Sequence, residues 1–247
     1  MSTESLQLVA HRGIPERFPE NSLIGLEAAM RSCVPYVEFD LQATRDGALV
    51  LSHDSDLRRI GGIEQSLFDL SLEQLKAFDL GQRERFGDRF HGTRIATLGE
   101  LVRLALKYPQ CQLLVELKTE SLQHFGIDTI IDRTLPQLDP LRARCTIISF
   151  HLPTLTELKS RRCGYRLGWI VRNCSQAEQA RARELTPNLI IASRQLLKPA
   201  SPRWPGPWRW VVYTVDDAAL ALAYAAAGIV LVETNDAESL TRALLRH

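Results

Sequence analysis

The chain has 247 residues, which is enough to bury the core of one large α/β domain or of two smaller ones. Its 30 lysines and arginines balance 29 aspartates and glutamates, and the formal charge of +1 argues against a nucleic-acid surface or a polybasic membrane arm. The expected partner is therefore a small molecule, with no nucleic acid and no stable membrane insertion. The composition leaves the oligomeric state open.

The N-terminal segment "MSTESLQ" is polar and lacks the basic start and apolar core of a secretory signal, so we expect a cytoplasmic location. The five cysteines are widely spaced and form no CxxC pair, which argues against a zinc site or a disulfide framework. They are Cys33, Cys111, Cys145, Cys163 and Cys174. Residues 218–232 are apolar but shorter than the roughly 20 residues that span a bilayer, and they predict a helix followed by a buried strand.

Eight short segments rich in apolar or β-branched residues predict strands. In chain order they cover residues 6–12, 36–42, 112–118, 145–150, 166–171, 188–193, 210–215 and 228–234. Their near-continuous apolar character is typical of parallel strands that are covered on both faces. Segments with apolar residues three or four positions apart lie between most of these strands and predict helices.

This alternation predicts a (β/α)8 TIM barrel that occupies residues 1–247 as a single domain. A doubly wound open sheet is the competing architecture, but no GxGxxG motif follows the first strand. Residues 54–96 are too long and too polar for one loop, and they predict a short insertion between core strands 2 and 3. Residues 194–209 contain four prolines and two tryptophans, and they predict a stiff loop before the seventh strand.

Three of the expected helices have candidate N-caps in the sequence. Asn21 precedes the first helix, and Thr97 precedes a later one with Glu100 three residues on, as in a capping box. Asp216 precedes the helix between the last two strands, and Gly228 ends that helix.

Charged residues gather where the first three core strands end. In such a barrel the carboxyl ends of the strands surround one mouth, which carries the active site. The segment "DGALVLSHD" after the second strand returns toward the same mouth. Together these strand ends and the return supply His11 and Arg12, Glu38 and Asp40, His53 and Asp54, and Glu116 and Lys118.

Carboxylates inside apolar strands cost free energy to bury unless they are paired or bind a metal. Glu38 and Asp40 are two residues apart and so point to the same side of their strand, and Glu116 ends the next strand. Three hard oxygen ligands suit one divalent cation, Mg²⁺ or Ca²⁺, better than zinc.

The cations and histidines of these strand ends suggest phosphate chemistry. Arg12 and Lys118 beside a metal would bind an anion such as phosphate, and His11 and His53 would be available as acid and base. Taken singly, each histidine could be structural, and the pairs Arg12 with Glu38 and Lys118 with Glu116 could be simple ion pairs. The joint occurrence of seven such residues on three successive strand ends favours an active site.

The remaining histidines and tryptophans have no comparable setting. We expect structural or surface positions for His91, His124, His151 and His247. We expect Trp204 and Trp208 to pack the proline-rich loop rather than to stack on a ligand.

With these residues in view, the sequence resembles the glycerophosphodiester phosphodiesterase family, which shares the barrel of phosphatidylinositol-phospholipase-C-like enzymes. The matching motifs are "AHRG" (10–13), "PENS" (19–22), "VEFDLQATRDGALVLSHD" (37–54), "LRR" (57–59), "ATLGEL" (96–101) and "VELK" (115–118). The segments "SF" (149–150), "YTVDD" (213–217) and "ETND" (233–236) match more loosely.

The resemblance implies a metal-dependent hydrolase that cleaves glycerophosphodiesters to sn-glycerol 3-phosphate and an alcohol. It implies that His11 and His53 are the acid/base pair, without saying which is which, and that residues 54–96 are a short form of the family's insertion. It further implies that the phosphate is bound by Arg12 and Lys118, and the metal by Glu38, Asp40 and Glu116.

The chain departs from the family in two places. The family commonly has tryptophan and asparagine where Tyr213 and Asp216 stand, a difference on the glycerol side of the site. It usually has aspartate and glycine where Val230 and Leu231 stand, at the closing edge of the barrel. Neither departure removes a proposed site residue.

Two alternatives remain open. A lysophospholipase D-like or sphingomyelinase D-like enzyme shares the barrel and the histidine pair, and the tryptophan-containing loop 204–210 could give it an apolar entrance. A barrel that binds a phosphate ligand without turnover would be favoured by a missing histidine or carboxylate, and none is missing. The preferred head group depends on loop shape and cannot be inferred from residue identity.

Overall fold

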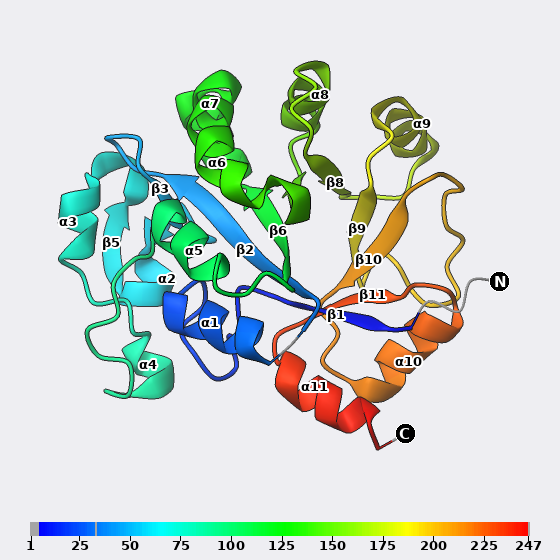
Figure 1. The fold of residues 1–247 in the computed structure, drawn as a ribbon, viewed down its shortest axis with the longest axis horizontal. Helices are drawn as coiled ribbons and strands as arrows, with labels where there is room; N and C mark the ends of the chain where they lie inside the picture. The colour runs from blue at the N-terminus through cyan, green and yellow to red at the C-terminus, as the bar shows by residue number, and fades with distance from the viewer. Residues whose placement is uncertain (1–4, 33, 247) are drawn as a thin grey trace.

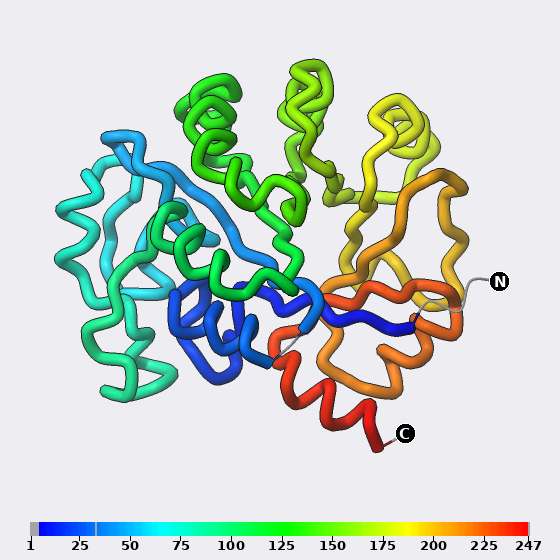
Figure 2. Tube along the Cα trace, in the orientation of Figure 1, coloured from blue at the N-terminus to red at the C-terminus, as the bar shows by residue number. Residues whose placement is uncertain are grey.

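The computed structural model describes residues 5–32 and 34–246, and over these residues eight parallel strands close into a barrel (Figure 1). The strands are β1 (Gln7–Ala10), β2 (Tyr36–Ala43), β6 (Gln112–Leu117), β7 (Cys145–Ser149), β8 (Arg166–Ile170), β9 (Leu189–Ser193), β10 (Arg209–Tyr213) and β11 (Leu231–Thr234). Figure 2 shows β1 beside β11, and the parallel pairing of these two strands closes the barrel. The predicted TIM barrel is confirmed, with all eight core strands at the expected segments.

Helices connect the strands and cover the outside of the barrel. They are α1 (Leu23–Arg31), α5 (Leu98–Ala105), α6 (Thr119–Phe125), α7 (Ile127–Leu138), α8 (Leu152–Ser160), α9 (Gln176–Leu185), α10 (Ala218–Ala226) and α11 (Ala237–Leu244), with a 3-10 helix, η2 (Asp139–Arg144), before β7. None of the described helices has the length and apolar character needed to cross a bilayer.

The core has two layers because successive side chains of a strand point to opposite faces. Val37 and Phe39 of β2 point outward into the large cluster that joins strands and helices. A smaller cluster lies inside the barrel, and it consists of Val9, Leu114, Ile148, Ile170, Leu189, Ile191, Val211 and Leu231. The inward positions Glu38 and Asp40, nearer the carboxyl end of β2, are charged, so the barrel interior changes from apolar to polar at its mouth.

The insertion between core strands 2 and 3 is also confirmed. It follows β3 (Leu49–Leu51), which pairs antiparallel with β2. It contains β4 (Asp56–Leu57), α2 (Arg58–Gly61), β5 (Ile63–Ser66), the 3-10 helix η1 (Leu67–Asp69), α3 (Leu72–Lys76) and α4 (Arg83–Phe86). Its apolar side chains, among them Leu57, Leu67 and Leu75, form a separate cluster beside the barrel (Figure 1, cyan).

One of the three predicted N-caps is confirmed and two are wrong. Thr97 caps α5 in a capping box with Glu100. The N-cap of α1 is Ser22, whose hydroxyl accepts from the Gly25 N–H, and Asn21 lies just before it. The Asn21 side chain instead hydrogen-bonds Asp40, so a contact across the fold displaces it from the cap.

The third cap is displaced by one residue for the same kind of reason. Asp217, not Asp216, caps α10 by accepting from the Leu220 N–H. Asp216 accepts hydrogen bonds from Thr234, the last residue of β11, and from Asn235, which follows it. Local sequence does not distinguish adjacent capping residues when one of them has a distant partner.

The proline-rich loop between β9 and β10 buries its tryptophans. Trp204, Trp208 and Trp210 are 8%, 6% and 9% exposed, and the Trp204 and Trp210 rings meet edge-on with centroids 5.5 Å apart. The prediction that Trp204 and Trp208 pack the loop is confirmed. Because the three indoles are buried, this loop gives no support to an apolar entrance for lipid.

The cysteines have mixed surroundings. Cys111 and Cys145 are buried, Cys163 is half-buried and Cys174 is exposed, and no disulfide joins any two of these four. Cys33 and His247 lie outside the described residues.

The turn after β1 requires a glycine. Gly13 has φ of +91°, and a Cβ at this position would lie 2.7 Å from the backbone carbon of Gly25 in α1. This close approach places the end of β1 directly against α1.

We expect Gly13→Ala to lower the free energy of unfolding more than Gly62→Ala does, by about 1–3 kcal/mol, because the added methyl group meets backbone that cannot move aside. Gly62 is the matched control, since it has φ of +68° and a Cβ there would have no atom within 4 Å. Urea unfolding of the two variants measures the difference. Equal losses would show that the Gly25 contact is unimportant.

Candidate active site

The structure brings all seven predicted site residues to the mouth of the barrel. Six of them line one pocket, together with Glu233 and the apolar or aromatic side chains of β7 to β10. Those six are His11, Arg12, Glu38, His53, Glu116 and Lys118. The seventh, Asp40, is fully buried and contacts Arg12 and Lys118.

Three carboxylates form a compact group. Glu38, Asp40 and Glu116 each offer one oxygen, and these oxygens lie within 4.8 Å of one another. Burial and the neighbouring Asp40 raise the pKa of Glu116 to about 7, and burial raises the pKa of Glu38 as well. Burial acts in the same direction on Asp40, but Arg12 and Lys118 outweigh it and hold the pKa of Asp40 below its usual range.

These carboxylates fit a divalent cation. Asp40 Oδ1 and Glu116 Oε1 are buried without a hydrogen bond, although Lys118 Nζ lies 3.4 Å and 3.0 Å from them. Hard, clustered oxygens with unused acceptor capacity are the donor set that Mg²⁺ and Ca²⁺ prefer.

Arg12 and Lys118 contact the carboxylates, and only one of the two expected ion pairs is found. Arg12 Nε lies 3.0 Å from Asp40 Oδ2, and the Arg12 backbone N–H, not its guanidinium, donates to Glu38 Oε2 at 3.0 Å. The expected ion pair between the side chains of Arg12 and Glu38 is therefore wrong. The expected ion pair between Lys118 and Glu116 is present. Both cations also line the pocket.

His11 is held from both sides of its ring. Nδ1 lies 2.8 Å from Asn235 Oδ1, and Nε2 lies 3.5 Å from Glu233 Oε1. Burial, with a smaller contribution from Arg12, lowers the pKa of His11 to about 4. The imidazole is therefore neutral at physiological pH.

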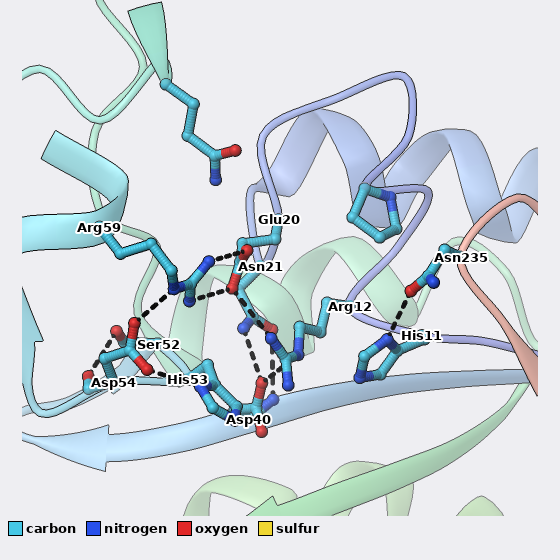
Figure 3. Close-up of polar contacts among 12 residues, drawn as sticks. His11, Arg12, Glu20, Asn21, Asp40, Ser52, His53, Asp54, Arg59 and Asn235 are labelled. Atoms are coloured by element: carbon cyan, nitrogen blue, oxygen red, sulfur yellow. Dashed lines mark hydrogen bonds and ion pairs between the residues drawn. The ribbon is translucent and has the colours of Figure 1, made fainter. Parts of the chain in front are cut away.

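His53 has different partners. Its Nδ1 lies 2.7 Å from Asp54 Oδ1, and Arg59 of α2 donates to Asp54 and also to Glu20, in the loop before α1. Figure 3 shows this chain of contacts, with Arg12 and Asp40 between the two imidazoles in that view. The insertion thus helps to position a residue of the site.

Sequence reasoning missed Glu233. This residue of β11 is only 4% exposed, and burial raises its pKa to about 8. The sequence contains a signal for this residue, because Glu233, like Glu116, is a charged residue at the end of an apolar strand. The roles of Asn235 and Arg59 could not be found in this way, since both lie in polar segments.

The chain matches the model of the glycerophosphoryl diester phosphodiesterase family over residues 11–238. A glycerophosphodiester phosphodiesterase of Caldanaerobacter subterraneus is 29% identical over 171 residues, which cover 69% of this chain and 68% of that protein. One of Bacillus altitudinis is 28% identical over 145 residues, which cover 59% of this chain and 58% of that protein. The match thus spans somewhat over half the length of the second relative.

Solved structures agree on the fold. An Oleispira antarctica phosphodiesterase in complex with the product sn-glycerol-3-phosphate has a TM-score of 0.83 and 23% identity, with 96% of each chain covered. A glycerophosphodiester phosphodiesterase of Parabacteroides distasonis has a TM-score of 0.80 and 21% identity, with 98% of this chain and 99% of that chain covered. Because the family model matches nearly the whole sequence, the chain belongs to the glycerophosphoryl diester phosphodiesterase family, a family of phosphoric diester hydrolases.

Proposed function

We propose that this protein hydrolyses glycerophosphodiesters to sn-glycerol 3-phosphate and an alcohol. The observation that carries the proposal is the convergence of two histidines, two cations and three carboxylates on one pocket mouth. The relatives named glycerophosphodiester phosphodiesterase, and the neighbour that holds sn-glycerol-3-phosphate, support the same substrate class.

Glu38, Asp40 and Glu116 are the residues that would hold one divalent cation, Mg²⁺ or Ca²⁺. Such a cation, when bound, polarises a phosphoryl oxygen and lowers the pKa of a hydroxyl group. Arg12 and Lys118 bind the phosphate, because a guanidinium and an ammonium at the pocket wall complement its charge.

The histidines move the protons. His11 is neutral and accepts the proton of the neighbouring glycerol hydroxyl as that oxygen attacks phosphorus and the new P–O bond of a cyclic phosphate forms; water then opens this ring, with the proton transfers reversed, to give sn-glycerol 3-phosphate. His53 donates a proton to the leaving alcohol oxygen as the old P–O bond breaks, and Asp54 orients the ring through its Nδ1. Arg12 and Lys118 hold the phosphate between the two rings, because their charges are opposite to its own.

The apolar wall of the pocket receives the rest of the substrate. Phe150 and Tyr213 line the pocket together with isoleucines of β7, β8 and β9. We further propose that residues 1–247 form one domain, with residues 54–96 as an insertion in it. The proposed location of the protein is the cytoplasm.

We expect His11→Ala and His53→Ala each to lower kcat by at least about a hundredfold on glycerophosphocholine, because each removes one proton-transfer group. His91→Ala is the control, since His91 is exposed in the insertion and its ring lies 2.6 Å from Asp79, away from the pocket residues. Release of glycerol 3-phosphate measures turnover. Near-normal turnover of either site variant would contradict the assignment.

Chelation should abolish turnover, and Mg²⁺ or Ca²⁺ should restore it. Glu116→Gln should weaken cation binding by at least about tenfold, as measured by calorimetric titration, because a neutral amide replaces a charged ligand. Glu64→Gln, on an exposed residue of β5, should bind the cation normally. Unchanged affinity of the Glu116 variant would rule out this carboxylate as a ligand.

Without a bound cation, in the presence of a chelator, the free energy of unfolding should fall as pH rises from 6.5 to 8.5. Glu116 and Glu233 have pKa values of about 7 and about 8, above their ordinary 4.5, so the folded state binds more protons than the unfolded chain in this window. The lowered pKa of His11, about 4 against its ordinary 6.5, makes stability rise with pH, and this opposite effect falls mainly below the window.

Thermal unfolding at the two pH values tests this sign. Added Ca²⁺ should raise Tm more at pH 8.5, where fewer protons compete for the carboxylates. A chelated protein that is more stable at pH 8.5 than at 6.5 would contradict the expectation, and Glu233→Gln should flatten the slope.

A further inference from the structure

A set of hydrogen bonds outside the pocket reaches His11 from the loop after β10. Asp216 Oδ1 accepts from Thr234 Oγ1 and from the Asn235 backbone N–H, both at 2.7 Å. Asp216 Oδ2 lies 3.0 Å from the Asn235 side-chain nitrogen. The Asn235 side-chain oxygen faces His11 Nδ1, as Figure 3 shows.

These contacts determine which way the Asn235 amide points. A carboxylate can only accept hydrogen bonds, so the NH₂ group of Asn235 must face Asp216. The amide oxygen is then the atom that faces His11. An amide oxygen can also only accept, so His11 Nδ1 must carry the hydrogen.

The proton on Nδ1 decides what the other ring nitrogen can do. A neutral imidazole carries one hydrogen, so Nε2 has a free lone pair. Nε2 is the nitrogen on the pocket side, 3.5 Å from Glu233. A histidine in the other tautomer would present an N–H there and could not accept a proton.

We propose that Asp216 and Asn235 are positioning residues that fix the Nδ1–H tautomer of His11 and so keep Nε2 available as the base. This inference rests on the proposed function for its catalytic consequence, while the tautomer itself rests on the contacts alone. Neither residue lines the pocket, so their effect reaches the substrate through His11.

Asp216→Asn tests the proposal because it should move the hydrogen of His11 from Nδ1 to Nε2. The Asn235 backbone N–H is a fixed donor, so the amide introduced at position 216 must keep its oxygen there and turn its NH₂ toward the Asn235 side chain. The Asn235 amide then flips and presents its own NH₂ to His11 Nδ1. The hydrogen of His11 moves to Nε2.

Two measurements follow this variant. Nitrogen-15 NMR of the histidine rings, with the His11 signals assigned by their loss in His11→Ala, should show the hydrogen on Nδ1 in the wild type and on Nε2 in Asp216→Asn. Turnover of glycerophosphocholine should show kcat lowered at least about a hundredfold, since a wrong histidine tautomer costs up to about 10⁴ in serine proteases. KM should change little.

The double variant Asp216→Asn/Asn235→Asp should restore the tautomer. A carboxylate at position 235 accepts both from the NH₂ at position 216 and from His11 Nδ1–H, and kcat should return to within about tenfold of the wild type. Asp217→Asn is the matched control. It keeps a good N-cap on α10 and should change neither the tautomer nor kcat.

A hydrogen that stays on Nδ1 in Asp216→Asn overturns the proposal, and so does an inverted tautomer with unchanged kcat. A double variant that fails to regain Nδ1–H also overturns it. The NMR experiment needs no turnover. If the wild-type protein did not hydrolyse glycerophosphodiesters, the proposed function would fail while the NMR data would still decide the tautomer.

Discussion

Asp40 is fully buried at the mouth of the barrel, and its charge is tolerable there because two cations contact it. Arg12 comes from the end of β1 and Lys118 from the end of β6, while Asp40 itself belongs to β2. These are three neighbouring strands of the barrel. The charge of Asp40 is therefore balanced only when the ends of these three strands are aligned. The same alignment fixes the positions of the other site residues on these strands.

Asp40 is one of several buried acidic groups at this mouth. Glu38, Glu116 and Glu233 add three buried carboxyl groups to the same mouth, and burial raises the pKa of each. The protein itself supplies only Arg12 and Lys118 among the residues that line this pocket. The divalent cation proposed for these carboxylates would add a positive charge for the substrate phosphate to meet.

The barrel and most of the site could be predicted because their signals are local. Eight apolar segments mark the strands, and the two-residue spacing of Glu38 and Asp40 places both on one face. The wrong caps at Asn21 and Asp216 share a cause, since each residue is bound by a partner far along the chain. Such partners, like the Arg59 contact to Glu20, exist only once the chain has folded, so no local pattern encodes them.

The two histidines reach the pocket from structures of different kinds. His11 ends a barrel strand whose pairing with β11 closes the barrel, so the barrel backbone fixes its position. His53 follows β3, which lies outside the ring of parallel strands, and Arg59 of the insertion secures its partner Asp54. The insertion thus supports His53 from outside the pocket, since none of the residues that line the pocket belongs to it. Any exchange of this segment between relatives therefore also exchanges the support of His53.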